Sequence, residues 1–79
     1  VDLTFRRVDL SDTAQVEGEA RRLSRVDILV YSAGVQTYGT VLSTSDETWA
    51  RTMAVNVDGA FKVCRALLPS MLTQGGSII

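Results

Sequence analysis

The spacing of apolar positions changes along the chain and predicts alternating strands and helices. Residues 1–10 carry apolar and β-favouring side chains that predict a strand, and residues 26–31 form the near-continuous apolar run of a buried parallel strand. A helix is predicted between them over residues 12–23, where Asp12 and Gln15 make a capping box. The apolar residues of this helix recur at i, i+4 and i+7: Val16, Ala20 and Leu23.

A longer amphipathic segment predicts one helix over residues 46–72, which would span ~40 Å. Thr44 with Glu47 makes a capping box at its start, and Ser45 is a rival N-cap. Pro69 falls in the last turn, where we expect it to kink or loosen the helix. The apolar positions of this helix recur every three or four residues: Trp49, Met53, Val57, Ala60, Phe61, Cys64, Leu67, Leu68 and Met71.

A third strand begins at the end of the sequence. Gly75 and Gly76 break the long helix, and residues 77–79 are again strand-forming. The predicted order is therefore strand, helix, strand, helix, strand. That alternation indicates an α/β fold with a doubly wound parallel sheet.

Composition narrows the classes of function. The chain has 79 residues, of which 46% are apolar and 22% charged, as in one small globular domain. Its net charge of −1 argues against nucleic acid or an anionic membrane as the partner, and no apolar run reaches the roughly 20 residues of a membrane span. The single cysteine, Cys64, excludes an internal disulfide and fits a reducing, cytoplasmic location. Without histidine, a Ser-His-Asp triad or a His-bearing zinc site cannot form, and we predict no metal site.

Two short segments follow the predicted strands, at the sheet edge where open α/β folds bind ligands. Asp9 and Leu10 close the first strand, and Ala33 and Gly34 close the second. The small side chains of Ala33 and Gly34 would let the backbone lie close to a ligand. Each segment also has a plainer interpretation: Asp9 as the start of a helix-capping turn, and Gly34 as an ordinary turn after a strand.

Asn56 is the most unusual residue of the long helix. It stands beside Val57, on the border of the apolar face. A buried amide at this place would need hydrogen-bond partners and would cost stability without them. The alternative is an exposed asparagine, or one that contacts only a neighbouring helix.

These segments resemble the short-chain dehydrogenase/reductase family, which has a Rossmann-type fold and uses NAD(H) or NADP(H). The resemblance runs through the whole chain, from the third strand of that fold to the start of the fifth. The family's Asn-Asn-Ala-Gly turn appears as residues 31–34, with Tyr31 and Ser32 in place of the asparagines. The acidic or amide residue that closes its third strand appears as Asp9, and its active-site asparagine as Asn56.

The resemblance implies roles for these residues. Asn56 would help to hold an ordered water in a proton relay to a catalytic lysine. Asp9 would accept a hydrogen bond from the adenine amino group, and the Leu10 amide would meet a ring nitrogen. In the family an asparagine of the turn ties neighbouring strands together, and the shorter Ser32 puts that tie in question. The implied cofactor-binding residues are Asp9, Leu10, Ser32, Ala33 and Gly34.

The resemblance further implies an oxidoreductase that interconverts a small alcohol and a carbonyl compound by hydride transfer. Such enzymes are often homo-oligomers, dimers or tetramers, and here helix 46–72 would pack against a partner subunit. A non-catalytic dinucleotide-binding or scaffold protein of the same fold is the alternative. An unrelated doubly wound domain, such as a flavodoxin-like module, is a third interpretation.

The chain is predicted to be the central fragment, residues 1–79, of one NAD(P)-binding domain. It contains neither the family's glycine-rich phosphate loop nor its Tyr-x-x-x-Lys pair, so alone it should be inactive. In the Rossmann strand order, two strands would separate residues 1–10 from residues 26–31, a gap of ~14 Å. Residues 1–10 would therefore have no strand partner within this chain.

Overall fold

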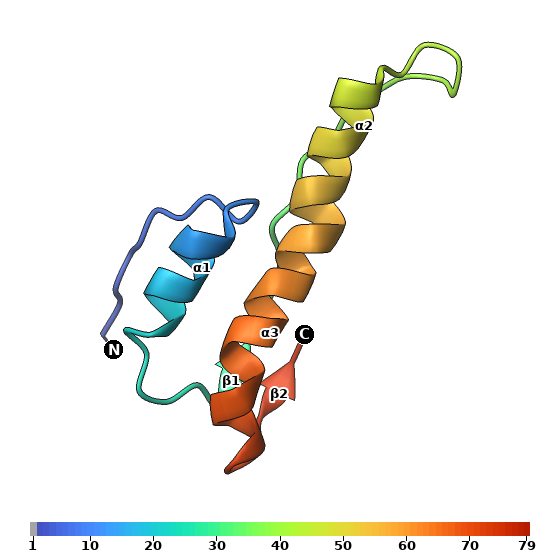
Figure 1. Ribbon diagram of the computed structural model, residues 1–79. Helices are drawn as coiled ribbons and strands as arrows, with labels where there is room; N and C mark the ends of the chain where they lie inside the picture. The colour runs from blue at the N-terminus through green and yellow to red at the C-terminus, as the bar shows by residue number, and fades with distance from the viewer. Residues whose placement is uncertain (1) are drawn as a thin grey trace.

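A continuous helical rod dominates the structure, a computed structural model that describes residues 2–79 (Figure 1). The rod consists of α2 (Asp46–Met53), the π-helical segment η1 (Ala54–Asp58) and α3 (Gly59–Leu72). Its bounds confirm the helix predicted over residues 46–72. Pro69 lies inside α3 without ending it. The π-helical segment is a feature that the apolar spacing did not predict.

The start of the rod corrects one prediction. Ser45 is the N-cap of α2: its backbone is extended (φ −75°, ψ 159°) and its hydroxyl accepts a hydrogen bond from the Thr48 N–H at 3.1 Å. The capping box of Thr44 and Glu47 is wrong, because the Thr44 hydroxyl donates instead to the Thr40 carbonyl at 2.7 Å. The rival N-cap, Ser45, is the one that forms.

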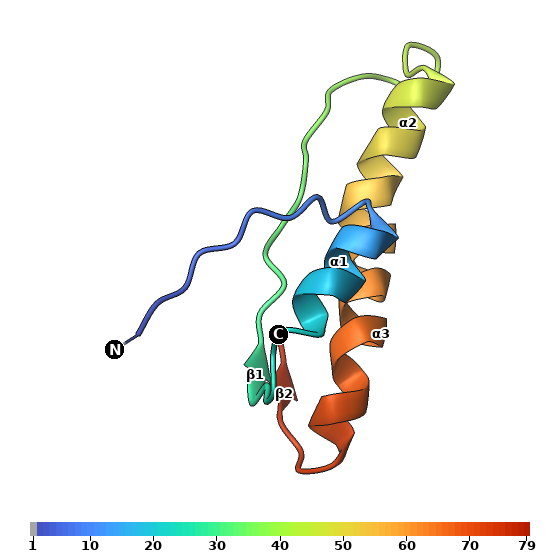
Figure 2. The same ribbon diagram turned by 60° about the vertical axis from the view of Figure 1, so that its left-hand side comes forward.

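The short helix α1 (Thr13–Ala20) packs against α3 (Figures 1 and 2). Asp12 caps it by accepting from the backbone N–H groups of Ala14 and Gln15, as predicted for the N-cap. The reciprocal bond of the predicted capping box does not form, because the Gln15 Oε1 accepts from the Asp9 N–H at 3.0 Å and the Asp12 N–H donates to the Asp9 carbonyl. The helix is shorter than predicted, because after Ala20 the chain tightens into a turn. Val16, on the inner face of α1, is only 5% exposed.

Two short parallel strands lie beside the lower end of the rod (Figures 1 and 2). β1 (Ile28–Leu29) pairs with β2 (Ser77–Ile78) in the register Ile28 to Ser77 and Leu29 to Ile78. Gly75, with φ +81°, turns the chain after α3 back toward the sheet. The strands are shorter than the apolar run of residues 26–31, because each can pair only along the length of its partner.

The strand predicted over residues 1–10 does not form within residues 2–10, and Val1 lies outside the described residues. This segment runs as an irregular, extended chain away from β1 (Figure 2). A strand needs a neighbour for its backbone hydrogen bonds, and the described residues provide none next to it. This is the consequence expected if two strands separate the two segments.

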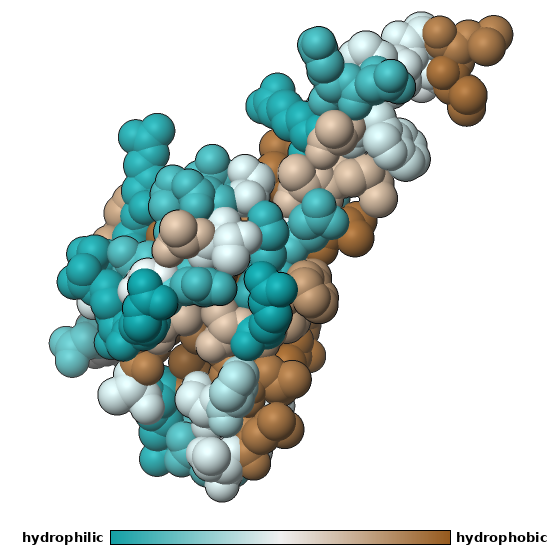
Figure 3. All heavy atoms as spheres, viewed as in Figure 1, coloured by the Kyte–Doolittle hydropathy of each residue, from teal (hydrophilic) through white to brown (hydrophobic). Residues whose placement is uncertain are grey.

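Little of the apolar surface is covered. Within residues 2–79, Val16 and Met71 are the buried hydrophobic residues. Figure 3 shows apolar side chains gathered along one side of the rod and at the loop tip beyond α2, where Val41 and Leu42 are almost fully exposed. No helix among these residues is long and apolar enough to cross a membrane.

Candidate functional site

The centre of the candidate site is a pair of hydrogen bonds between the rod and the turn after β1. The Asn56 Oδ1 accepts from the Val35 N–H at 2.8 Å, and the Asn56 Nδ2 donates to the Val35 carbonyl at 2.9 Å. A Cβ on Gly34 would lie 3.2 Å from the Asn56 Oδ1, so the missing side chain of Gly34 permits this approach. The structure therefore joins the two features that the sequence singled out, Asn56 and the Gly34 turn.

Asn56 is exposed, as one of its alternative interpretations held, yet both ends of its amide are bonded. An amide oxygen has two acceptor positions and an amide nitrogen has two hydrogens. After the bonds to Val35, one acceptor position and one hydrogen remain. Neither makes a hydrogen bond to another group within residues 2–79.

The local helix geometry at Asn56 is unusual. The N–H of Gly59 donates to the carbonyl of Ala54, five residues back, in place of the carbonyl of Val55. Such π-helical turns are rare and occur frequently at functional sites. The Val55 carbonyl instead accepts a hydrogen bond from the Tyr31 hydroxyl at 2.6 Å. A tyrosine hydroxyl is protonated near neutral pH and can donate, and partial burial raises the pKa of Tyr31 further above its usual value.

Asp9 lies in a tight turn that leads into α1. Its Oδ1 accepts from the Ser11 N–H at 3.0 Å and from the Ser11 hydroxyl at 2.6 Å. These bonds, with a smaller contribution from the charge of Lys62, lower the pKa of Asp9. The helix-capping interpretation of Asp9 thus describes its geometry. The capping turn leaves part of the carboxylate without a partner, because the Asp9 Oδ2 accepts no hydrogen bond within residues 2–79.

Lys62 ties this turn to the rod. Its ammonium group donates to the Ser11 carbonyl at 2.7 Å, across 51 residues of sequence. The turn after Asp9 and the turn after β1 also meet at Gly59, which is buried. A Cβ at Gly59 would lie 2.6 Å from the Tyr31 hydroxyl and 3.4 Å from Leu10.

The remaining predicted residues make fewer contacts. Ser32 and Ala33 are exposed between β1 and Gly34, and the Ser32 hydroxyl has no hydrogen bond to any described residue. Sequence reasoning missed the roles of Tyr31 and Lys62. The signal for Tyr31 was its departure from the family turn, whereas nothing in the sequence marks Lys62.

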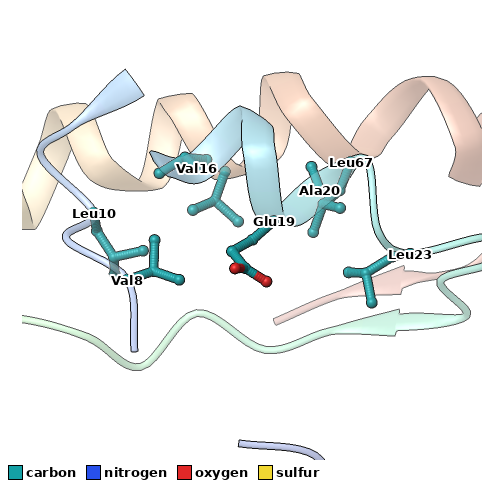
Figure 4. Close-up of a pocket in the computed structure, with 8 residues that line it drawn as sticks. Val8, Leu10, Val16, Glu19, Ala20, Leu23 and Leu67 are labelled. Carbon is teal, nitrogen blue, oxygen red and sulfur yellow. The ribbon is translucent and has the colours of Figure 1, made fainter. Parts of the chain in front are cut away.

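A separate apolar hollow lies between α1, α3 and residues 8–10 (Figure 4). Of the predicted site residues only Leu10 lines it. Its walls are hydrophobic side chains apart from Glu19, and such walls suit packing against other apolar groups. They include Val8, Leu10, Val16, Ala20, Leu23 and Leu67.

Comparisons with known proteins agree with the sequence and the geometry. All of residues 1–79 match the short chain dehydrogenase family. Meso-2,3-butanediol dehydrogenase of Serratia marcescens is 37% identical over 76 residues, covering 91% of this chain and 30% of that protein. An uncharacterized NAD-dependent oxidoreductase of Mycobacterium tuberculosis is 35% identical over 80 residues, covering 94% of this chain and 29% of that protein.

A solved structure shows the same architecture. The ligand-free aldohexose dehydrogenase of Thermoplasma acidophilum superposes with a TM-score of 0.82 at 27% identity, over 89% of this chain and 29% of that one. The likeness confirms the predicted Rossmann-type α/β fold class and overrules the flavodoxin-like interpretation. The chain spans less than a third of the length of each of these proteins.

Proposed function

Because the chain belongs to the short-chain dehydrogenase family, we propose that it is the central part of an NAD(P)-dependent oxidoreductase. The enzyme interconverts a small alcohol and a carbonyl compound by hydride transfer. The observation that carries this proposal is the double hydrogen bond by which Asn56 holds the Gly34 turn. Relatives named as a butanediol dehydrogenase and an NAD-dependent oxidoreductase support the reaction class.

The proposed cofactor, NAD or NADP, supplies the hydride acceptor or donor when it is bound. The residues of this chain fit such a group at two places. The backbone at Gly34 lacks a side chain that would obstruct a ligand, and the Asp9 Oδ2 accepts no hydrogen bond from residues 2–79, so it can accept one from a ligand. The proposed cofactor-binding residues are Asp9, Leu10, Ser32, Ala33 and Gly34.

Asn56 is the proposed catalytic residue of this segment. Its remaining acceptor position and hydrogen can orient a water molecule, which is what a proton relay requires. The Tyr-x-x-x-Lys pair implied by the family would belong to the rest of the domain. On this proposal residues 1–79 form the central fragment of one domain and are inactive alone.

Titrating the protein in its full-length form with NADH and NADPH, followed by nicotinamide fluorescence, tests the proposal. We expect binding of at least one dinucleotide and oxidation of a small alcohol by its oxidised form. Gly34→Ala should weaken binding at least about fivefold, because the new Cβ crowds Asn56. Gly18→Ala is the matched control, since its Cβ would meet nothing closer than 4.0 Å. Failure to bind either dinucleotide would contradict the proposal.

A non-catalytic dinucleotide-binding or scaffold protein is the second candidate. The observation that favours it is the altered turn, in which Tyr31 and Ser32 replace both family asparagines. The same titration separates the two candidates: a scaffold protein binds the dinucleotide and turns over no alcohol.

We also propose a homo-oligomer, dimer or tetramer, that forms through helix 46–72. Large apolar side chains project from this rod: Trp49, Val57, Phe61, Leu68 and Leu72. Phe61 is 61% exposed, with the Arg65 guanidinium 4.9 Å from its ring centroid. In light scattering, Phe61→Glu should lower the mass of the full-length protein, and the neighbouring Asp58→Ser should not. A monomeric wild type would contradict this proposal.

Two further parts of the proposal concern the cell and the substrate. A cytoplasmic location is supported by the free thiol of Cys64, which needs no oxidising compartment. The proposed substrate is a small alcohol or carbonyl compound. We propose that the protein has no nucleic acid partner, no membrane partner and no metal. Among residues 2–79, no group of three His, Cys, Asp or Glu side chains could hold a metal ion.

A further inference from the structure

We propose that Tyr31 is a positioning residue that, together with Gly59, clamps the turn after β1 to the π-helical segment. The proposal rests on the proposed function in one respect only, namely that this turn is part of the proposed cofactor-binding site. Tyr31 stands where the family turn has an asparagine, and its side chain connects the end of β1 to the rod, whereas the tie expected from the family asparagine joins neighbouring strands.

The first step is the position of Tyr31 in the sheet. Its N–H donates to the Ile79 carbonyl at 2.8 Å, which continues the pairing of β1 with β2. The backbone of Tyr31 is therefore fixed at the end of the strand, while its half-buried side chain crosses to the rod. One residue thus connects the sheet and the helix.

The second step is the acceptor that Tyr31 reaches. Since the Gly59 N–H bonds to Ala54, the Val55 carbonyl does not receive it. The Tyr31 hydroxyl donates to that carbonyl at 2.6 Å. A partly buried carbonyl without a hydrogen-bond donor lowers the stability of the folded state. By donating to the Val55 carbonyl, the Tyr31 hydroxyl therefore stabilises the π-helical turn as well as the strand end.

The third step is the space for the hydroxyl. Gly59 is buried, and a Cβ there would lie 2.6 Å from the Tyr31 hydroxyl oxygen. Every other atom near that Cβ is at least 3.4 Å away. The glycine is therefore required by the hydroxyl itself, and a phenylalanine at position 31 would leave room for an alanine at position 59.

The fourth step joins this clamp to the candidate site. Tyr31 bonds to Val55, and the next residue, Asn56, bonds to Val35. The segment of residues 31–35 is thus held to adjacent residues of the rod at both of its ends. Ser32, Ala33 and Gly34 lie between these two attachments, so the clamp sets the position of the proposed cofactor-facing backbone.

Amide exchange in the full-length protein tests the clamp without cofactor. Tyr31→Phe removes only the hydroxyl, and we expect the Val35 N–H to exchange about 2- to 10-fold faster, as for the loss of one hydrogen bond. Tyr38→Phe is the matched control, since Tyr38 is 88% exposed and no hydrogen bond of its hydroxyl is seen among the described residues. Unchanged exchange at Val35 in Tyr31→Phe would overturn the proposal.

A double-mutant cycle tests the role of Gly59. Gly59→Ala alone should lower the unfolding midpoint, and Tyr31→Phe should restore much of that loss, because the clash is with the hydroxyl oxygen. Additive effects of the two substitutions would overturn the pairing of Tyr31 with Gly59.

Cofactor affinity separates positioning from general stability. Tyr31→Phe should raise the Kd for the dinucleotide about 2- to 10-fold at a temperature where the protein is folded. Ser45→Ala, which removes the N-cap at the start of α2 and changes none of the proposed cofactor-binding residues, should lower the unfolding midpoint without changing that Kd. An equal rise in both variants would overturn the positioning role.

If the wild type binds no dinucleotide, the proposed function fails. Amide exchange and the double-mutant cycle would still test the clamp, because neither experiment needs the cofactor.

Discussion

Asn56 shows how one side chain can organise a site while it is exposed to solvent. Its amide oxygen accepts from the Val35 N–H, and its amide nitrogen donates to the Val35 carbonyl. Only an amide has this pattern, because a carboxylate accepts without donating and a hydroxyl is too short to span both groups. The residue type is therefore required by geometry, whatever role the remaining polar positions have.

Asn56→Asp tests this requirement with almost no change of shape. The substituted oxygen would face the Val35 carbonyl across about the present 2.9 Å, replacing an attraction with a repulsion. We expect the free energy of unfolding to fall by about 1–2 kcal/mol at pH 7 in chemical denaturation of the full-length protein. Asp58→Asn, the reverse exchange two residues later, should have little effect. Equal effects of the two substitutions would contradict the amide requirement.

Asp9 provides a pH-dependent prediction. Hydrogen bonds from Ser11 hold the pKa of Asp9 below its usual value of 3.8. A group whose pKa is lowered by folding stabilises the folded state above its unfolded pKa, and the stabilisation is lost as the pH falls through the folded pKa. An NMR titration of the Asp9 carboxyl should therefore show a midpoint below 3.8. Ser11→Ala should move the midpoint upward, and an unchanged midpoint would contradict this cause.

At the scale of elements, the long helix was predictable and its irregularity was not. Apolar spacing and the Gly75 break set both ends of the rod, because these signals are local. The π-helical turn contacts the Tyr31 hydroxyl, which reaches the rod from the end of β1 and lies close to Gly59, so its surroundings come from residues far apart in the sequence. For the same reason the partner of Asn56, a backbone group 21 residues away, could not be read from the sequence.

The start of the rod can be tested by comparing two substitutions. Ser45→Ala removes the oxygen that accepts from the Thr48 N–H, and should cost about 1 kcal/mol of stability. Glu47→Ala should cost only about 0.3 kcal/mol, from the weaker interaction of its charge with the helix N-terminus. Thermal unfolding followed by the fluorescence of Trp49, one turn further along, measures both changes. A larger loss for Glu47→Ala would restore the capping box that the structure rejects.

On the scale of the whole molecule, residues 2–79 are elongated, with extents of 47 × 24 × 22 Å. The order of elements and the parallel pairing of β1 with β2 followed from the sequence, since a strand that leads into a helix and then another strand favours this arrangement. The strand over residues 1–10 did not follow, because a strand forms by pairing and its apolar pattern alone cannot provide a neighbour.

The last prediction concerns residues 1–79 expressed alone. Among the residues that the structure describes, only Val16 and Met71 are buried apolar side chains, too few to offset the conformational entropy of the chain. We expect partial helix content, binding of a hydrophobic dye, and no cooperative unfolding transition by circular dichroism.

Val16→Ala provides the internal comparison for this prediction. It should leave the melting of the isolated segment unchanged and cost the full-length protein about 1–3 kcal/mol, because Val16 stabilises only a packed state. A cooperative transition of the isolated segment as a monomer would contradict both expectations. It would also show that the rod and the two short strands suffice as a folding unit, and that the clamp of Tyr31 and Asn56 contributes more stability than its few hydrogen bonds imply.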